Sequence, residues 1–317
     1  MYYRRIKNVQ PAVPTVEGSS VFLKRSLGFN SPEAGDPFLL LDDLCCDNPA
    51  WYEEGFPSHP HRGFESLTYM QMGTMEYRDS FGNYGNIPAG GVQQLGAGSG
   101  IIHREIPRGN KQGKVRGFQL WINMPSQQKM TSPVCRDFLP NEIPELILDD
   151  RIMVRVVSGS FGGVTGPVRN NSVDLEFLDI IMPPNTPFIY SCGSESTVLA
   201  YVVSGYATFD DGMDAFDFDE ICRGYMDYEN KKTFIDRCNL ILYEQNGNDI
   251  IISTHDDWAH FLLISGKPIK ESIAWYGPIV MNKRWELRQA FEEYNNGIFL
   301  KQNTDGHQTS HVMNEAV

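Results

Sequence analysis

Two short segments of this 317-residue chain carry the side chains best suited to metal chemistry. His59 and His61 stand two positions apart, and so do His103 and Glu105. Residues two apart in an extended strand point to the same face, so each pair would project together. Two such pairs on neighbouring strands of a narrow barrel would converge on its interior. Three imidazoles and a carboxylate suit a divalent transition metal, whereas calcium and magnesium favour oxygen ligands.

Four protein ligands would leave two open positions on an octahedral metal, where a bidentate substrate, dioxygen or water could bind. Iron, manganese, cobalt, nickel, copper and zinc all fit this donor set. His255 and His260 are five apart, which puts them on opposite faces of a strand, so we interpret them as structural or surface residues. No further His-x-His or His-x-Glu pair follows residue 105, which indicates a single metal site.

The elements that must position these residues are predicted to be β-strands. Turn residues recur every 8–12 positions between runs rich in Val, Ile, Phe and Tyr, which is typical of an all-β sandwich or barrel. The first set of expected strands is Phe38–Asp43, Phe64–Met72, Met75–Arg78, Val92–Leu95, Ile101–Ile106 and Phe118–Asn123. The second set is Ile152–Ser158, Val173–Met182, Val198–Val203, Ala207–Phe209, Asn239–Tyr243, Ile250–Ser253 and His260–Ile264.

The length of the chain favours two domains over one. A proline-rich stretch, residues 125–146, separates the two strand sets and is interpreted as the crossing between domains. We therefore expect a metal-binding domain at 1–140, a second domain without metal at 141–300, and a disordered polar tail at 301–317.

Two local patterns refine this division. The segments Leu67–Tyr77 and Leu199–Phe209 align as strand, glycine, strand, with Gly73 matching Gly205, and this indicates a duplicated domain. Near the end of the chain, residues 282–297 predict a helix, with Asn282 as N-cap, Gly297 as its stop, and Trp285, Ala290, Phe291 and Tyr294 on one packed face.

Composition restricts the partners. The net charge of −13 argues against direct binding to nucleic acid, because the basic clusters are small. The six cysteines form no Cys-x-x-Cys pair and are expected to be reduced thiols. No apolar run has the length of a signal peptide or a membrane span. We expect a cytoplasmic protein, or a nuclear one in a eukaryotic cell, with small-molecule or protein partners.

Several runs together resemble the pirin family of the cupin superfamily. The resemblance extends from about residue 4 to residue 299, and it is densest in the first domain. The residues that carry it are 38–43 (FLLLDD), 55–65 (GFPSHPHRGFE), 76–82 (EYRDSFG), 98–105 (GSGIIHRE), 117–123 (GFQLWIN) and 273–282 (IAWYGPIVMN).

The resemblance implies two cupin domains that face each other, with one metal ion, usually iron(II), in the first domain only. The family's ligands fall on His59, His61, His103 and Glu105. Cupins outside this family often use a glutamate soon after His-x-His, which would be Glu65 here, and we rank it second to Glu105.

The resemblance also implies two different functions. One is a quercetin 2,3-dioxygenase-like enzyme that opens a flavonol or related phenolic substrate with dioxygen, with Glu105 as the base for the 3-hydroxyl proton. Phe56, Phe64 and Gln93 are then candidates for the substrate pocket. The alternative is a metal- or redox-sensing regulator that binds a transcription factor or a metabolic enzyme. A third hypothesis is a storage or scaffold protein whose metal only stabilises the barrel.

Overall fold

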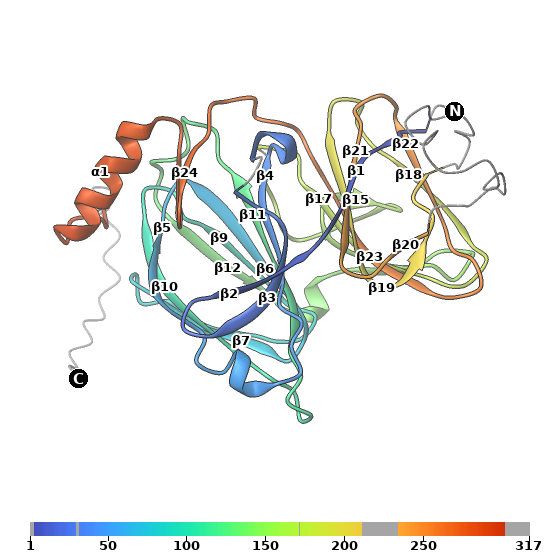
Figure 1. Ribbon diagram of the computed structural model, residues 1–317, viewed down its shortest axis with the longest axis horizontal. Helices are drawn as coiled ribbons and strands as arrows, with labels where there is room; N and C mark the ends of the chain where they lie inside the picture. Colours follow the sequence, from blue (N-terminus) through green and yellow to red (C-terminus); the bar gives the residue numbers. More distant parts are fainter. Residues whose placement is uncertain (1–2, 30–31, 171, 211–233, 302–317) are drawn as a thin grey trace, which may run out of the picture. The chain divides into compact units, whose positions relative to one another are not determined.

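The computed structural model describes residues 3–29, 32–170, 172–210 and 234–301. Strands dominate it, and its one α-helix among these residues, α1 (Arg284–Asn295), lies near the C-terminus (Figure 1). The predicted all-β class with a short C-terminal helix is therefore confirmed. No helix in the described ranges has the length and apolar character needed to cross a membrane.

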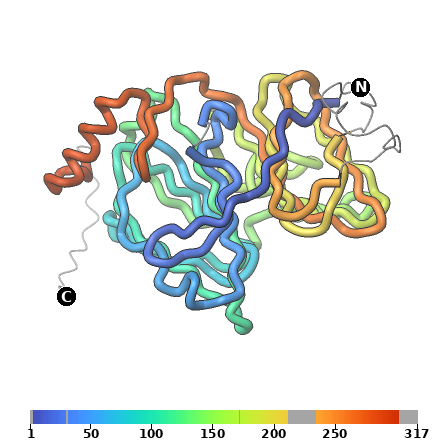
Figure 2. Tube along the Cα trace, in the orientation of Figure 1, coloured from blue at the N-terminus to red at the C-terminus, as the bar shows by residue number. Residues whose placement is uncertain are grey.

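The contacts divide the chain into two compact units. We call Val13–Ile143 with Ile269–Val317 the first domain, and Met1–Ala12 with Pro144–Pro268 the second domain. The chain thus passes between domains three times, and the colours in Figure 2 follow these passages.

These limits differ from the sequence-based ones at both ends of the chain. The middle passage, after residue 143, lies close to the expected boundary at 140, but the first twelve residues join the second domain. The N-terminal strand β1 (Ile6–Pro11) pairs with a strand of that domain, and the buried Arg4 donates hydrogen bonds to three of its carbonyl oxygens. The predicted tail lies, except for Lys301, outside the described residues.

The first domain contains two antiparallel sheets. The larger has the order β12 (Val134–Phe138), β9 (Val92–Gly96), β6 (Phe64–Met72), β11 (Arg116–Asn123), β4 (Phe38–Asp43), β3 (Val21–Leu27) and β2 (Val13–Glu17). The smaller has the order β5 (Phe56–His61), β10 (Ile101–Arg108), β7 (Thr74–Asp79) and β8 (Tyr84–Ile87). A hairpin of β24 (Ala274–Tyr276) and β25 (Ile279–Met281) leads into α1.

The main sheet of the second domain repeats the larger sheet of the first position by position. Its order is β1, β21 (Asn239–Tyr243), β19 (Thr197–Ala207), β23 (Ala259–Gly266), β17 (Glu176–Met182), β14 (Met153–Ser158) and β13 (Glu145–Ile147), and β20 (Ile235–Asp236) pairs with β19. Smaller pairs are β18 (Pro187–Ser191) with β22 (Asp249–Ser253), and β15 (Ser160–Phe161) with β16 (Val164–Thr165). The shared strand order supports the duplication that the repeat indicated.

The two glycines of the repeat, Gly73 and Gly205, occupy equivalent positions that require glycine. Gly73 and Gly205 have φ angles of +75° and +72°, in the left-handed region that favours glycine. A Cβ atom at Gly73 would lie 2.4 Å from the carbonyl oxygen of Arg108, and one at Gly205 would lie 1.9 Å from that of Trp258. In both domains the backbone therefore turns against a neighbouring strand at a point where no side chain fits.

The proline-rich segment that we interpreted as the crossing between domains also contains a strand. Within residues 125–146, β12 pairs with β9 and forms the edge of the first domain's larger sheet. The apolar pattern missed this strand because its side chains are only partly buried or exposed, as is usual for an edge strand.

The predicted helix is present but begins later than expected. Lys283, and not Asn282, is its N-cap, and the Glu286 carboxylate accepts hydrogen bonds from the backbone N–H groups of both residues. Ala290 is buried as predicted, whereas Trp285 is 55% exposed. The predicted apolar face is therefore wrong at Trp285.

Candidate metal centre

The two predicted ligand pairs lie on neighbouring strands of the smaller sheet. Strands β5 and β10 are antiparallel, and their register sets His59 directly opposite His103. Along β10, His103 and Glu105 are buried while Arg104 between them is exposed. The alternation expected of a strand therefore turns both side chains into the domain, as the sequence predicted.

The structure brings the three imidazoles together. Their potential ligand nitrogens all lie within 4.8 Å of one another, and such a group could hold a metal ion. The ring centroids of His59, His61 and His103 are separated by 4.5–4.6 Å. Three rings this close, without a hydrogen bond between them, present lone pairs to a common point.

The free nitrogens fit a metal ion. Nδ1 of His59 lies 2.8 Å from the carbonyl oxygen of Pro57, so this nitrogen carries the proton and leaves Nε2 as the ligand atom. Both ring nitrogens of His61 and Nε2 of His103 are buried without a hydrogen-bond partner. Buried polar atoms are rarely left unpaired, and here a bound cation would satisfy them.

The electrostatics of the site keep these rings neutral. Burial lowers the pKa of His59 and of His103 to about 4, and repulsion from His103 adds to the effect at His59. Burial and the two neighbouring imidazoles lower the pKa of His61 well below its ordinary value. A metal ion binds the neutral form of an imidazole. The three histidines are already neutral at neutral pH, so no proton has to leave them when a metal ion binds.

The Glu105 carboxylate lies beside the histidines but outside their tight group. Its Oε2 atom is 4.0 Å from Nε2 of His103. The Gln119 amide donates to its two oxygens at 3.4 and 3.2 Å, and the Thr68 hydroxyl donates at 3.4 Å. Burial raises the pKa of this carboxyl, against the opposing effects of His59 and the two donors. Its role as the fourth ligand stays a prediction.

The surroundings of Glu105 were missed by the sequence analysis. The Trp121 indole N–H donates to Oε1 of Gln119 at 3.0 Å, which turns the amide nitrogen of Gln119 toward Glu105. Gln119 is a buried polar residue in the otherwise apolar run 118–122. A polar residue within such a run was the one feature of the sequence that could have marked Gln119 as part of the site. Trp121 also meets His61 edge to face, with ring centroids 5.1 Å apart.

The three predicted pocket residues have different surroundings. The Phe64 ring stacks on Trp121 at 4.2 Å and lies 4.8 Å from the His61 ring, so it borders the histidine cluster. Phe56 is partly buried and packs against a separate apolar cluster of the first domain. Gln93 is buried and donates a hydrogen bond to Asp137 at 3.2 Å.

Glu65, the second-ranked carboxylate, lies on the opposite face of its strand from the site. Phe64, Ser66 and Thr68 are buried, and Thr68 reaches Glu105, whereas Glu65 is only partly buried between them. Strand alternation therefore directs Glu65 away from the histidines. It is not part of the histidine group.

The residue that follows His61 connects the site to the C-terminal segment. Arg62 is 2% exposed and pairs with Glu293 of α1 at 2.8 Å. The same guanidinium donates to the Phe299 carbonyl at 2.9 Å and lies 4.2 Å from the Phe299 ring centroid. The backbone N–H of Val280 donates to the Arg62 carbonyl oxygen at 3.0 Å. The C-terminal residues therefore hold the end of β5 in place.

The corresponding strand pair of the second domain is filled with apolar side chains. Phe188 and Tyr190 of β18, and Ile250 and Ile252 of β22, are buried in that domain's core. The second domain therefore keeps the strand pair of the first domain. Its interior is packed with these apolar side chains, whereas the first domain has histidines there.

Comparison with known sequences agrees with this organisation. Residues 21–122 match the Pirin family, and residues 177–300 match the Pirin C-terminal cupin domain. A pirin-like protein of Caulobacter vibrioides is 35% identical over 300 residues, which cover 94% of this chain and 100% of that protein. A protein of Pseudomonas aeruginosa, provisionally named quercetin 2,3-dioxygenase, is 34% identical over 300 residues, covering 93% and 98% of the two chains.

Solved structures show the same fold. The crystal structure of quercetin 2,3-dioxygenase from Acinetobacter baumannii has a TM-score of 0.79 at 23% identity, covering 94% of this chain and 99% of that one. A bacterial pirin from Escherichia coli, in complex with nickel(II), has a TM-score of 0.56 at 20% identity, covering 84% and 98%.

Both cupin domains are thus matched in order, and a pirin-like relative is 35% identical along its whole length. This chain belongs to the pirin family.

Proposed function

We propose that this protein is a metal-dependent dioxygenase that acts on a flavonol or related phenolic compound such as quercetin. One divalent transition metal ion would be held by His59, His61, His103 and Glu105. The observation that carries the proposal is the cluster of three neutral imidazoles, in which the buried nitrogens of His61 and Nε2 of His103 have no hydrogen-bond partner. The provisional name of the Pseudomonas aeruginosa relative supports the substrate class.

Iron(II) is our first choice of metal, and manganese, cobalt, nickel, copper and zinc also suit the ligands. The nickel complex of the Escherichia coli pirin supports a site in this family that accepts a divalent transition metal. When bound, the ion would acidify the substrate's 3-hydroxyl group and hold the substrate beside dioxygen.

The role proposed for Glu105 is to take the proton of the 3-hydroxyl group. Burial raises the pKa of this carboxyl, and a higher pKa makes the carboxylate a stronger base. Gln119 holds both carboxylate oxygens through its amide nitrogen, so the base has a fixed orientation. Trp121 fixes the amide in turn, because its indole N–H can only donate.

The walls of the proposed site follow from the same contacts. Phe64 and Trp121 present two stacked rings next to His61, and such a surface suits a planar aromatic substrate. Phe56 and Gln93 remain candidates for the outer part of the pocket. Phe56 pairs with Glu105 across the β5–β10 register, and Gln93 pairs with Thr68 across β6–β9.

Oxygen consumption tests the proposal directly. Protein loaded with each metal in turn should consume dioxygen in the presence of quercetin, and His61→Ala should abolish the reaction. His255→Ala is the matched control, because His255 lies in the second domain beside Phe234 and Thr208. An absence of turnover with every metal, on protein whose metal content has been verified, would contradict the proposed activity.

A further inference from the structure

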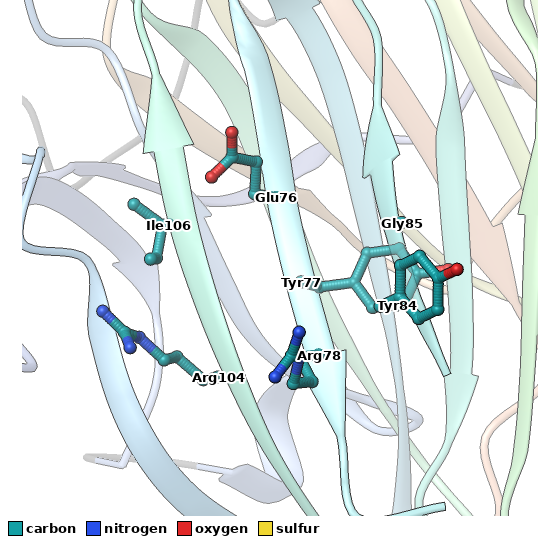
Figure 3. Close-up of a pocket in the computed structure, with 7 residues that line it drawn as sticks. All are labelled: Glu76, Tyr77, Arg78, Tyr84, Gly85, Arg104 and Ile106. Carbon is teal, nitrogen blue, oxygen red and sulfur yellow. The ribbon is translucent and has the colours of Figure 1, made fainter. Parts of the chain in front are cut away.

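Three side chains form a row across the outer face of the smaller sheet of the first domain. Arg104 of β10 stands directly opposite Arg78 of β7, and Arg78 stands directly opposite Tyr84 of β8. All three are exposed, and Tyr84 retains 74% of its accessible surface. Figure 3 shows them on adjacent strands around a common pocket. This face is the reverse of the one that carries the histidines.

The two arginines are an unusual pair for their position. Like charges directly opposite one another on neighbouring strands are destabilising. Within the described part of the chain, neither guanidinium has an acidic partner to offset this repulsion. Glu76, the nearest acidic residue of the pocket lining, is already paired with Arg108 at 2.9 Å. Two positive charges thus stand together on a protein of net charge −13.

The row borders an open depression in the surface. The pocket has a volume of about 340 Å³, in the range of sites for small molecules. Ile106 adds an apolar wall on the β10 side. The lining thus combines two cations, an exposed aromatic ring and an aliphatic surface.

We propose that this pocket binds the phosphate monoester of a small organic molecule, with the phosphate between Arg78 and Arg104 and the organic group against Tyr84. The site is separate from the histidine cluster and does not depend on the function proposed for it.

The geometry favours a phosphate over a carboxylate. Directly opposed residues of an antiparallel pair have Cβ atoms about 5 Å apart, so two long guanidinium side chains can turn toward one group between them. A carboxylate is satisfied by one guanidinium fork, whereas a doubly charged phosphate has oxygens for both. Tyr84 then provides a ring on which an aromatic or ribose-like group could lie.

Calorimetric titration of the metal-loaded full chain at low ionic strength tests this assignment. The probes are inorganic phosphate, phenyl phosphate and benzoate. We expect phenyl phosphate to bind most tightly and benzoate most weakly. Arg78→Gln and Arg104→Gln should each weaken phenyl phosphate binding about tenfold, because each removes a charged donor. Tyr84→Ala should reduce phenyl phosphate to the affinity of inorganic phosphate and leave the latter unchanged.

Two control variants make the result specific. Arg136→Gln removes an exposed arginine of β12, away from the pocket, and should leave binding unchanged. His61→Ala should also retain binding, which would distinguish this pocket from the metal centre. The proposal is overturned if millimolar phenyl phosphate does not bind, or if benzoate binds equally well. It also fails if Arg136→Gln is as damaging as the pocket variants.

Discussion

Replacing His103 by phenylalanine should make the metal-free protein more resistant to acid. The folded protein keeps His103 buried and neutral, with a pKa lowered to about 4 from an ordinary 6.5. Between these values the unfolded chain binds more protons than the folded one, so stability falls as the pH falls. By pH 4 this one residue costs the folded state about 3 kcal/mol relative to neutral pH.

The size of this effect makes it measurable. A cost of about 3 kcal/mol is a large share of the stability of many domains. His59 also has a lowered pKa, partly through repulsion from His103, so it adds to the acid sensitivity in the same direction. The assay is urea unfolding of metal-free wild type and His103→Phe between pH 7 and pH 4. Carboxylates titrate in both proteins, so the difference between the two curves reports the loss of His103 together with the loss of its repulsion at His59 and His61.

Two parallel stability curves would mean that His103 titrates in the folded protein as it does in the unfolded chain. An imidazole with a pKa near 6.5 is solvated or paired with an acid, and neither fits a buried ligand. NMR titration of the ring protons provides an independent check of the same quantity.

Three further changes test other parts of the structure. Gln119→Leu removes both amide contacts to the Glu105 carboxylate, and we expect it to lower oxygen uptake and to cost about 1–3 kcal/mol of stability in urea unfolding. Gly73→Ala should lower the melting temperature much more than Gly82→Ala. Both glycines have positive φ, but only at Gly73 would the added Cβ meet backbone, 2.4 Å away, whereas Gly82 has open space. Trp285→Ala should change stability by less than about 0.5 kcal/mol, because this side chain is 55% exposed on the helix.

The convergence of the histidines could be predicted because it depends on a local rule. Side chains two apart share a face in any strand, so the pairs His59 with His61 and His103 with Glu105 needed only the strand assignment. The register that sets His59 opposite His103 could not be derived, because it depends on pairing between segments over forty residues apart.

Long-range contacts account for what the sequence analysis missed. Strand β12 has little apolar pattern, since an edge strand buries few side chains. The N-terminal twelve residues belong to the second domain because β1 pairs with β21, more than 200 positions away, and no local signal encodes that. Gln119 was overlooked for the related reason that its importance comes from Glu105 and Trp121, which meet it only in the folded domain.

We propose that the three imidazoles and Glu105 bind one transition metal ion. X-ray absorption at the metal edge, on protein reconstituted with iron(II) under anaerobic conditions, measures the ligand set directly. We expect one ion per chain with three nitrogen ligands from histidine and one carboxylate oxygen, and loss of the ion in His61→Ala. A stoichiometry near zero, or a bound ion whose surroundings are unchanged in that variant, would contradict it.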